Sequence, residues 1–176
     1  MYTITWIESL QFQMVVLHVK SHKEVEVEIS RLSRVDFGLL KKSKAFEFDW
    51  SAYSHYDVYK LILKETREIL GLMCLEDKSD TAFNCTEIVL LETRPDQRGA
   101  SKTYDRIAGC LIAFAARQAF KNGHEGWIFL IAKSQIAQLY HDKYGFEDIG
   151  GINTLAIRMA SNSRNSMRLI QKYINP

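Results

Sequence analysis

The residues best suited to chemistry follow a short apolar strand near the middle of the chain. Residues 87–93 have the length and composition of a buried strand, which must end at Pro95 because proline has no N–H with which to continue a ladder. The small, polar and basic segment 97–103 then leads into an apolar-periodic helix expected over residues 103–121. The first amides of a helix lack partners and the helix dipole is positive there, so this segment is suited to hold an anion. The same residues also fit an ordinary connection in which Thr103 caps the helix.

Periodic segments on either side predict the elements that must position this loop. Strands are expected at residues 14–19, 25–29, 46–50, 57–64, 68–74 and 126–131, with a last hairpin over 146–159 that breaks at Gly150 and Gly151. Further helices are expected at 29–42, with Ile29, Leu32, Val35 and Leu39 on its apolar face, at 134–143, with Ser134 as N-cap, and at 161–174. Three consecutive strands, ending with 87–93, should form an antiparallel meander. Strand 126–131 follows a helix and should therefore lie parallel to strand 87–93.

Length and composition limit the class of protein. A chain of 176 residues, 47% of them hydrophobic, can bury one sizeable core, so residues 1–176 are expected to form a single domain. The net charge of +2 and the scattered Lys and Arg residues give no indication of nucleic-acid binding. Neither a membrane span nor a signal peptide is evident, which predicts a cytoplasmic protein, monomeric or homodimeric. No metal is expected, since His18 and His22 fit a surface pair better than a metal site. The three cysteines have no C-x-x-C spacing and are predicted to be buried thiols.

Several motifs together resemble the core of the GNAT-type N-acyltransferases. They are Pro95-Asp96-Gln97-Arg98-Gly99, then Ile107-Ala108-Gly109-Cys110-Leu111-Ile112 on the helix, then Leu139-Tyr140 and Tyr144-Gly145-Phe146. The resemblance implies a mixed α/β fold: a splayed, mostly antiparallel sheet of about seven strands with helices on both faces. It also implies that acetyl-CoA, as co-substrate, lies between the fourth and fifth strands of that sheet. The expected activity is that of an N-acetyltransferase, which moves an acetyl group to a primary amine of a protein, peptide or small molecule.

Such a reaction needs a base and an acid. A lysine-like amine of pKa about 10.4 is mostly protonated at pH 7, and freeing it costs about 4 to 5 kcal/mol, which a nearby carboxylate can offset by taking the proton. Glu92 is the preferred base and Glu87 the alternative; being five residues apart, they lie on opposite faces of a strand unless a bulge intervenes. Tyr140 is the expected acid for the leaving thiolate, with His141 or Tyr144 as alternatives. Without the resemblance, the glutamates are ordinary solvated or ion-paired strand residues and Tyr140 is a core residue.

The resemblance also implies a cofactor site around the loop. The backbone of residues 91–93 should pair with the pantetheine arm, and the loop 97–103 should hold the diphosphate. The residues expected to bind the cofactor are Leu91, Thr93, Gln97, Arg98, Gly99, Ala100, Ser101, Lys102, Thr103, Tyr104, Ala108 and Lys133. Arg106 stands where a second glycine is usual in GNAT proteins, and it either grips a phosphate or fills the cofactor's space. Two other functions fit: an acyl-CoA-binding module without turnover, and an interaction protein that docks through the aromatic strand 46–50.

Overall fold

The computed structural model describes residues 13–79 and 83–175, so the first residues, which the sequence predicts not to form a signal peptide, lie outside the described part. The strands are β1 (Gln13–His18), β2 (Glu24–Arg31), β3 (Asp57–Leu63), β4 (Ile69–Asp77), β5 (Thr86–Thr93), β6 (Tyr104–Asp105), β7 (Ile128–Lys133), β8 (Glu147–Asn153), β9 (Ala156–Ser161) and β10 (Ile174–Asn175). The helices are α1 (Arg34–Ser43), α2 (Ile107–Lys121), α3 (Ser134–Tyr144) and α4 (Ser163–Tyr173), with short 3-10 turns η2 (Trp50–Tyr53) and η3 (Pro95–Gln97).

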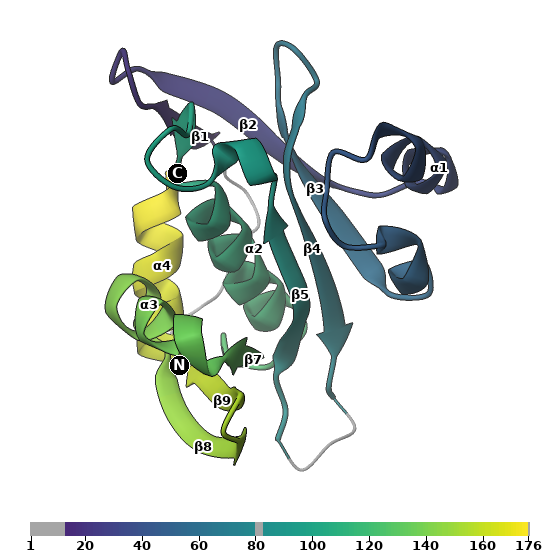
Figure 1. Cartoon of the computed structure of the whole chain (residues 1–176). Coiled ribbons are helices and arrows are strands. Elements are labelled where there is room, and N and C mark those ends of the chain that lie inside the picture. Colours follow the sequence, from purple (N-terminus) through teal and green to yellow (C-terminus); the bar gives the residue numbers. More distant parts are fainter. Residues whose placement is uncertain (1–12, 80–82, 176) are drawn as a thin grey trace.

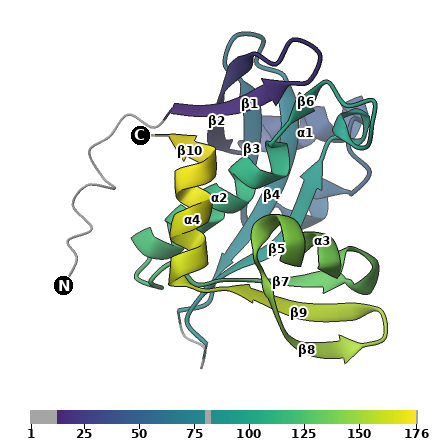
Figure 2. The same ribbon diagram turned by 90° about the vertical axis from the view of Figure 1, so that its left-hand side faces the viewer.

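All strands of the described part join one mixed sheet, in the order β10-β1-β2-β3-β4-β5-β7-β9-β8, with β6 paired to β1 beside this order. The pair β5–β7 is parallel and the neighbours β3, β4 and β5 form the predicted antiparallel meander. Helices α2, α3 and α4 lie on one face, and α1 lies with η2 on the other (Figure 1, Figure 2). This confirms the predicted fold class, although about seven strands is too few. The two-residue strands β6 and β10 are too short to carry a periodic signal.

The sheet is splayed at its parallel pair, as predicted. In the described part, β5 pairs with β7 only from Thr86 to Ile88. At the next residue, Val89, the pairing of β5 with β4 slips by one position, which is a β-bulge. A bulge bends its strand and increases the local twist. Beyond Val89, β5 therefore continues along β4 while β7 continues along β9, and the two parallel strands part.

The predicted strand 46–50 is wrong. This segment bends and then enters η2, and it pairs with no strand in the described part of the chain. Its amides are satisfied differently, since the N–H groups of Glu47 and Phe48 donate to the side chain of Glu92. Trp50 is buried at 2% exposure while Phe48 is 43% exposed, so the aromatic residues do not form one flat docking surface.

The central helix α2 begins at Ile107, later than the predicted start at residue 103. Tyr104 and Asp105 are drawn into β6, where they pair with β1, and this pairing prevents a helical conformation. Arg106 then occupies the N-cap position with φ 75°, so Thr103 is not the cap. At its other end, the helix stops at Asn122, as predicted.

Three smaller predictions also differ from the structure. Helix α1 begins at Arg34, after a capping box formed by Ser33 and Asp36, so Ile29 and Leu32 precede the helix, and Val35 and Leu39 are 71% and 59% exposed. The turn of the last hairpin lies between β8 and β9 at residues 154–155, because Gly150 and Gly151 lie inside β8 and pair with Arg158 and Ile157, between two shifts in register. Helix α3 has Lys133, not Ser134, at its N-cap.

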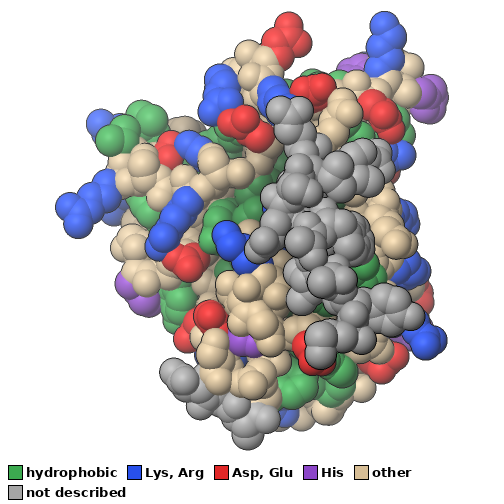
Figure 3. Space-filling model, turned by 180° about the vertical axis from the view of Figure 1, so that it is seen from behind, with side chains coloured by type: hydrophobic (Ala, Val, Ile, Leu, Met, Phe, Trp, Pro, Cys, Tyr) green, Lys and Arg blue, Asp and Glu red, His purple; other side chains and the backbone are tan. Residues whose placement is uncertain are grey.

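The buried cysteines and the mixed charges of the surface are those expected from the sequence. Cys74, Cys85 and Cys110 are buried free thiols. Basic and acidic side chains are interspersed over the coloured part of the face in Figure 3, which shows no stripe of one sign there. No helix in residues 13–79 and 83–175 combines the length and hydrophobicity that a membrane crossing requires.

Replacing either of two helix glycines by alanine should change the free energy of unfolding, in opposite directions. A β-carbon at Gly109 in α2 would lie 2.3 Å from the ring of Tyr173 in α4, whereas one at Gly38 in α1 would meet nothing within 4 Å. Gly109→Ala should lower the free energy of unfolding by about 1 to 3 kcal/mol through overpacking. The control Gly38→Ala should raise it by up to about 1 kcal/mol through helix propensity. Urea denaturation measures both, and a Gly109→Ala variant as stable as the parent would contradict the α2–α4 contact.

Candidate functional site

Beyond Ile88, one edge of β5 is free of β7. The N–H of Arg94 donates to the carbonyl of Leu70 on β4 at 2.9 Å. Backbone polar groups alternate in direction along a strand, so those of Thr93 and Leu91 point away from β4, toward the open side. The N–H groups of both residues and the C=O of Leu91 can pair with an extended ligand there, while the C=O of Thr93 accepts a hydrogen bond from Nε of Arg98.

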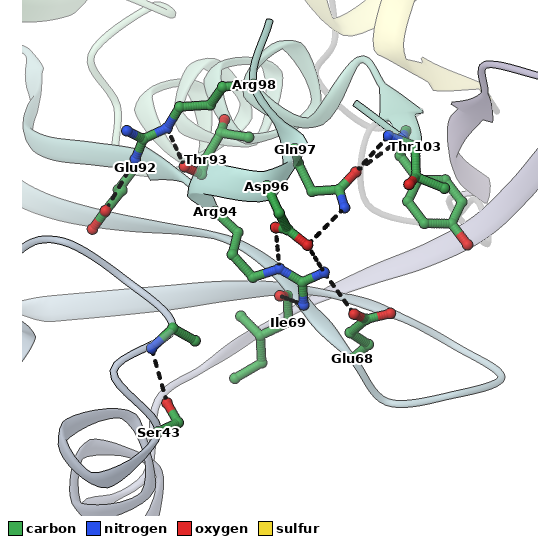
Figure 4. A network of polar contacts seen from close by, with 12 residues as sticks. Ser43, Glu68, Ile69, Glu92, Thr93, Arg94, Asp96, Gln97, Arg98 and Thr103 are labelled. Carbon is green, nitrogen blue, oxygen red and sulfur yellow. Dashed lines mark hydrogen bonds and ion pairs between the residues drawn. The ribbon is translucent and has the colours of Figure 1, made fainter. Parts of the chain in front are cut away.

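Arg94 fixes the direction in which the chain leaves the sheet (Figure 4). Its Nε lies 2.6 Å from Oδ1 of Asp96, and its Nη2 lies 2.6 Å from Oε1 of Glu68. Its Nη1 also donates to the carbonyl of Ile69 at 3.2 Å. The hydrogen bond from Arg94 lowers the pKa of Asp96. These contacts tie η3, and with it the start of the following loop, to β4.

Gln97 shapes that loop from inside. Its side chain is buried at 5% exposure, and its Oε1 accepts hydrogen bonds from the N–H groups of Thr103, at 3.2 Å, and Tyr104, at 3.0 Å. Two of the amides that the sequence predicts to face an anion are therefore satisfied within the protein. Gly99 has φ 70°, a left-handed conformation that glycine adopts without strain, and it lets the chain turn back toward α2.

The end of the loop, residues 104–106, leads away from β5. Tyr104 and Asp105 run to the edge of the sheet, where β6 pairs with β1 (Figure 2). The guanidinium of Arg106 points the same way, with Nη1 3.4 Å from Oε1 of Glu24 on β2. Arg106 is therefore not lodged between the two parallel strands.

A cavity of about 210 Å³ lies where the loop meets α2 and α3. Its lining residues are Thr93, Gln97, Arg98, Gly99, Lys102, Tyr104, Asp105, Arg106, Ile107, Ala108, Leu139, Lys143 and Tyr144. Most of the predicted cofactor-binding residues thus come together at one cavity. The others lie elsewhere: Leu91 farther back on β5, Ala100, Ser101 and Thr103 exposed on the loop, and Lys133 exposed at the end of β7.

Positive charge prevails around this cavity. The basic side chains in its lining are Arg98, Lys102, Arg106 and Lys143, and the acidic one is Asp105. Burial opposes ionisation of Asp105, but hydrogen bonds from Lys102 and from the N–H of Arg106 lower its pKa. The first turn of α2 opens at the same place, where helix amides and the helix dipole favour negative charge. The arrangement can hold a polyanion such as a diphosphate.

Sequence reasoning missed the contribution of α3 to this cavity. Leu139, Lys143 and Tyr144 line it from the side opposite the loop. Leu139 and Lys143 are four residues apart, a spacing that places both on one side of a helix. That spacing is the signal that could have identified them.

Glu92 is buried, and its carboxylate is surrounded by hydrogen-bond donors. It is 2% exposed, and each of its carboxylate oxygens accepts two hydrogen bonds. Oε1 accepts from the N–H of Glu47 at 2.7 Å and from Nη2 of Arg98 at 3.0 Å. Oε2 accepts from Nε1 of Trp50 at 2.7 Å and from the N–H of Phe48 at 3.4 Å. The carboxylate therefore ties the segment before η2 to the end of β5.

The bulge in β5 brings Glu87 and Glu92 to the same face of the sheet. Glu87 pairs with Glu76 and Glu92 with Leu72, and these two residues of β4 share a face because they are an even number apart. Without the bulge, the two glutamates would face opposite sides. Glu87 nevertheless lies in the part of β5 that is still paired with β7, and its Oε2 is 3.3 Å from Nζ of Lys78.

The side chain of Arg98 links the end of β5 to the segment before η2, and Figure 4 shows its contacts with Glu92 and Thr93. Its Nε donates to the carbonyl of Thr93 at 2.7 Å, on the open edge of β5. Its Nη1 and Nη2 pair with Glu47 at 2.8 Å and Glu92 at 3.0 Å. To grip a phosphate, as the resemblance implies, Arg98 must release some of these partners.

Two of the three acid candidates face the core. Tyr140 is partly buried, and its ring centroid lies 6.0 Å from that of Tyr144 and 5.8 Å from that of Phe146. Burial raises the pKa of both tyrosine hydroxyls, so they remain protonated at neutral pH. His141 is exposed, with Nδ1 2.9 Å from Oδ1 of Asp142. The structure thus separates the two tyrosines, on the inner side of α3, from His141 on its outer side.

No protein-family model matches the sequence, and no curated protein sequence matches it either. Solved structures match the fold. A mutant form of the spermidine/spermine N-acetyltransferase SpeG from Vibrio cholerae has 15% identity and a TM-score of 0.57, over 81% of this chain and 98% of that chain. A GNAT family acetyltransferase from Listeria monocytogenes has 15% identity and a TM-score of 0.51, over 78% and 95% of the two chains.

A third match, AtaTR bound with AcCoA, has 15% identity and a TM-score of 0.55, over 82% of this chain and 98% of that chain. The matches extend over most of this chain and nearly all of each matched chain, while the sequences have diverged widely. They agree with the mixed α/β fold that the resemblance implies. The chain has the fold of the GNAT-type acetyltransferases.

Proposed function

We propose that this protein transfers an acetyl group from acetyl-CoA to a primary amine. The observation that carries the proposal is the parting of β5 from β7, which leaves an open strand edge that leads to the basic cavity at the start of α2. The fold supports it, because its neighbours include acetyltransferases and one of them, AtaTR, is bound with AcCoA.

The pantetheine arm and the diphosphate of acetyl-CoA would each contact a different part of the site. The amide-rich pantetheine arm would pair with the backbone of Leu91 and Thr93, in place of the missing neighbour strand. The diphosphate would lie in the cavity, near Lys102 and Lys143 and the first turn of α2. Gln97 would act indirectly, because its side chain holds the loop amides rather than the ligand.

The reaction would be a direct attack. The amine nitrogen forms a bond to the thioester carbonyl carbon, the carbon–sulfur bond breaks, and the electron pair leaves with the CoA sulfur. Tyr140 would give its proton to that thiolate, for which its partly buried, protonated hydroxyl is suited. The amine proton would pass to Glu92, which lies closer to the open edge than Glu87, after Glu92 releases one of its hydrogen-bond donors.

The amine acceptor would bind beside residues 46–51, the segment whose N–H groups donate to Glu92. A second cavity, of about 340 Å³, lies there between the end of α1 and residues 46–51. Its lining includes Lys41 and Lys44 as well as Glu47 and Asp49, and its apolar part includes Phe46. Since charges of both signs are present, the lining matches a small polar amine better than a strongly cationic chain.

A binding module without turnover is the second candidate. The observation that favours it is the state of Glu92, whose two oxygens already accept four hydrogen bonds. A carboxylate in this state has no free lone pair for an incoming amine. Such a protein would bind acetyl-CoA equally well but release no CoA.

Acetyl-CoA should stabilise the purified protein. At a concentration about 100 times Kd, binding to the native state adds about 2.7 kcal/mol, seen as a rise in Tm. Lys102→Met should weaken binding about three- to tenfold, because a charge is lost beside the diphosphate. Lys20→Met, in the exposed turn after β1, is the matched control and should bind as the parent does. A parent protein whose Tm does not respond to acetyl-CoA would refute both the transferase and the binding module.

Glu92→Gln separates an anchoring role from a catalytic one. An amide cannot accept all four hydrogen bonds, so the anchoring role predicts a loss of about 1 to 3 kcal/mol in the free energy of unfolding. A base role would add a fall in kcat of about 100-fold or more. We expect the loss of stability, measured by urea denaturation. Glu87→Gln, which removes only the contact with Lys78, is the control and should leave stability nearly unchanged.

Tyr140→Phe should lower kcat about 100-fold while acetyl-CoA binding and stability stay close to the parent, because the ring and its packing are retained. Thiol release with a panel of primary amines measures this. Since burial raises the pKa of Tyr140, the parent should keep its acid through pH 9 and lose it only above the ordinary tyrosine pKa of about 10. A full kcat in Tyr140→Phe, or a loss confined to Tyr144→Phe, would move the acid role away from Tyr140.

A further inference from the structure

The basic cavity already contains an anion of the protein's own. The carboxylate of Asp105 lies in its lining, with the side chain 38% exposed. Its Oδ1 is 2.9 Å from Nζ of Lys102 and 3.9 Å from Nζ of Lys143, and it accepts the N–H of Arg106 at 2.8 Å. These three partners belong to the loop, to α3 and to the start of α2, which are the three elements that surround the cavity.

The position of Asp105 is a consequence of the chain path described above. Because Tyr104 and Asp105 pair with β1, the chain reaches α2 through a sharp turn at Arg106. At this turn, the N–H of Arg106 donates to the carboxylate immediately before it. The loop therefore ends on an acidic residue at the point where a bound anion would gain most from the helix N-terminus.

The same groups that would bind a diphosphate are thus engaged by Asp105. Lys102 and Lys143 are 28% and 41% exposed, so they remain accessible to a ligand while they are paired. An entering diphosphate must share these lysines with Asp105 or displace it, and the two anions repel each other at short range.

We propose that Asp105 is an internal counter-anion that competes with the diphosphate of CoA for Lys102 and Lys143. The inference rests on the proposed function and adds a residue that sets how tightly the donor and the CoA product are held. It assigns the effect to the phosphorylated half of the cofactor, since pantetheine carries no charge that Asp105 could repel.

Calorimetry with CoA and with pantetheine tests this, on the parent and on Asp105→Asn. Asparagine retains the acceptor for the N–H of Arg106 but removes the charge. The variant should bind CoA about five- to tenfold more tightly, and pantetheine with unchanged affinity. The gain should shrink at high salt, where exposed charges are screened. Asp105→Ser provides a second variant, in case the asparagine variant is unstable.

Asp148→Asn is the matched control. Asp148 is an exposed residue on β8 that also accepts a backbone N–H, that of Gly150, at 2.8 Å, but it does not line the cavity. It should leave CoA binding unchanged. If the parent binds CoA and the Asp105 variants bind it equally or more weakly, the counter-anion role is overturned while the proposed function stands. If neither the parent nor any variant binds CoA, the proposed function fails and the inference fails with it.

Discussion

The pairing of β5 with β7 ends at Ile88, and the candidate site depends on this break. A parallel pair that continued to Thr93 would satisfy the N–H and C=O groups of β5 within the sheet and leave none for a ligand. The bulge at Val89 prevents this, because it adds twist where β5 still follows β4 and β7 already follows β9. The bulge also turns Glu87 and Glu92 to one face.

Two buried acceptors hold the loops on either side of the open edge. Gln97 accepts two amides of the loop that precedes α2, and Glu92 accepts two amides and the Trp50 indole of the segment that enters η2. A buried donor without a partner is costly, so a loop that supplies such donors is held in the conformation that satisfies them. Arg98 contacts Glu92, Glu47 and Thr93 together, and it thereby joins the two loops across the end of β5.

The predicted site residues that the structure brings together are close to one another in the chain. The apolar run of β5, the proline after it and the basic segment around Lys102 lie next to one another in the chain, and the structure brings Thr93, at the end of that run, and Lys102 to one cavity. Leu139, Lys143 and Tyr144 on α3 were missed as lining residues because helical spacing indicates which residues share a side of α3 but not what that side faces. Asp105 was missed as well, since its role arises only when β6 pairs with β1.

The sequence by itself determined the elements whose signal is local: the strand β5, the periodic helix α2, the parallel strand after it and the order in which they follow one another. These depend on side-chain periodicity and on the missing N–H of Pro95, both of which act within a few residues. Only the tertiary structure decided that residues 46–50 do not form a strand, that α2 starts late and which groups pair with Glu92. In each case a hydrogen-bonding group from a distant part of the chain satisfied the backbone better than the local pattern could.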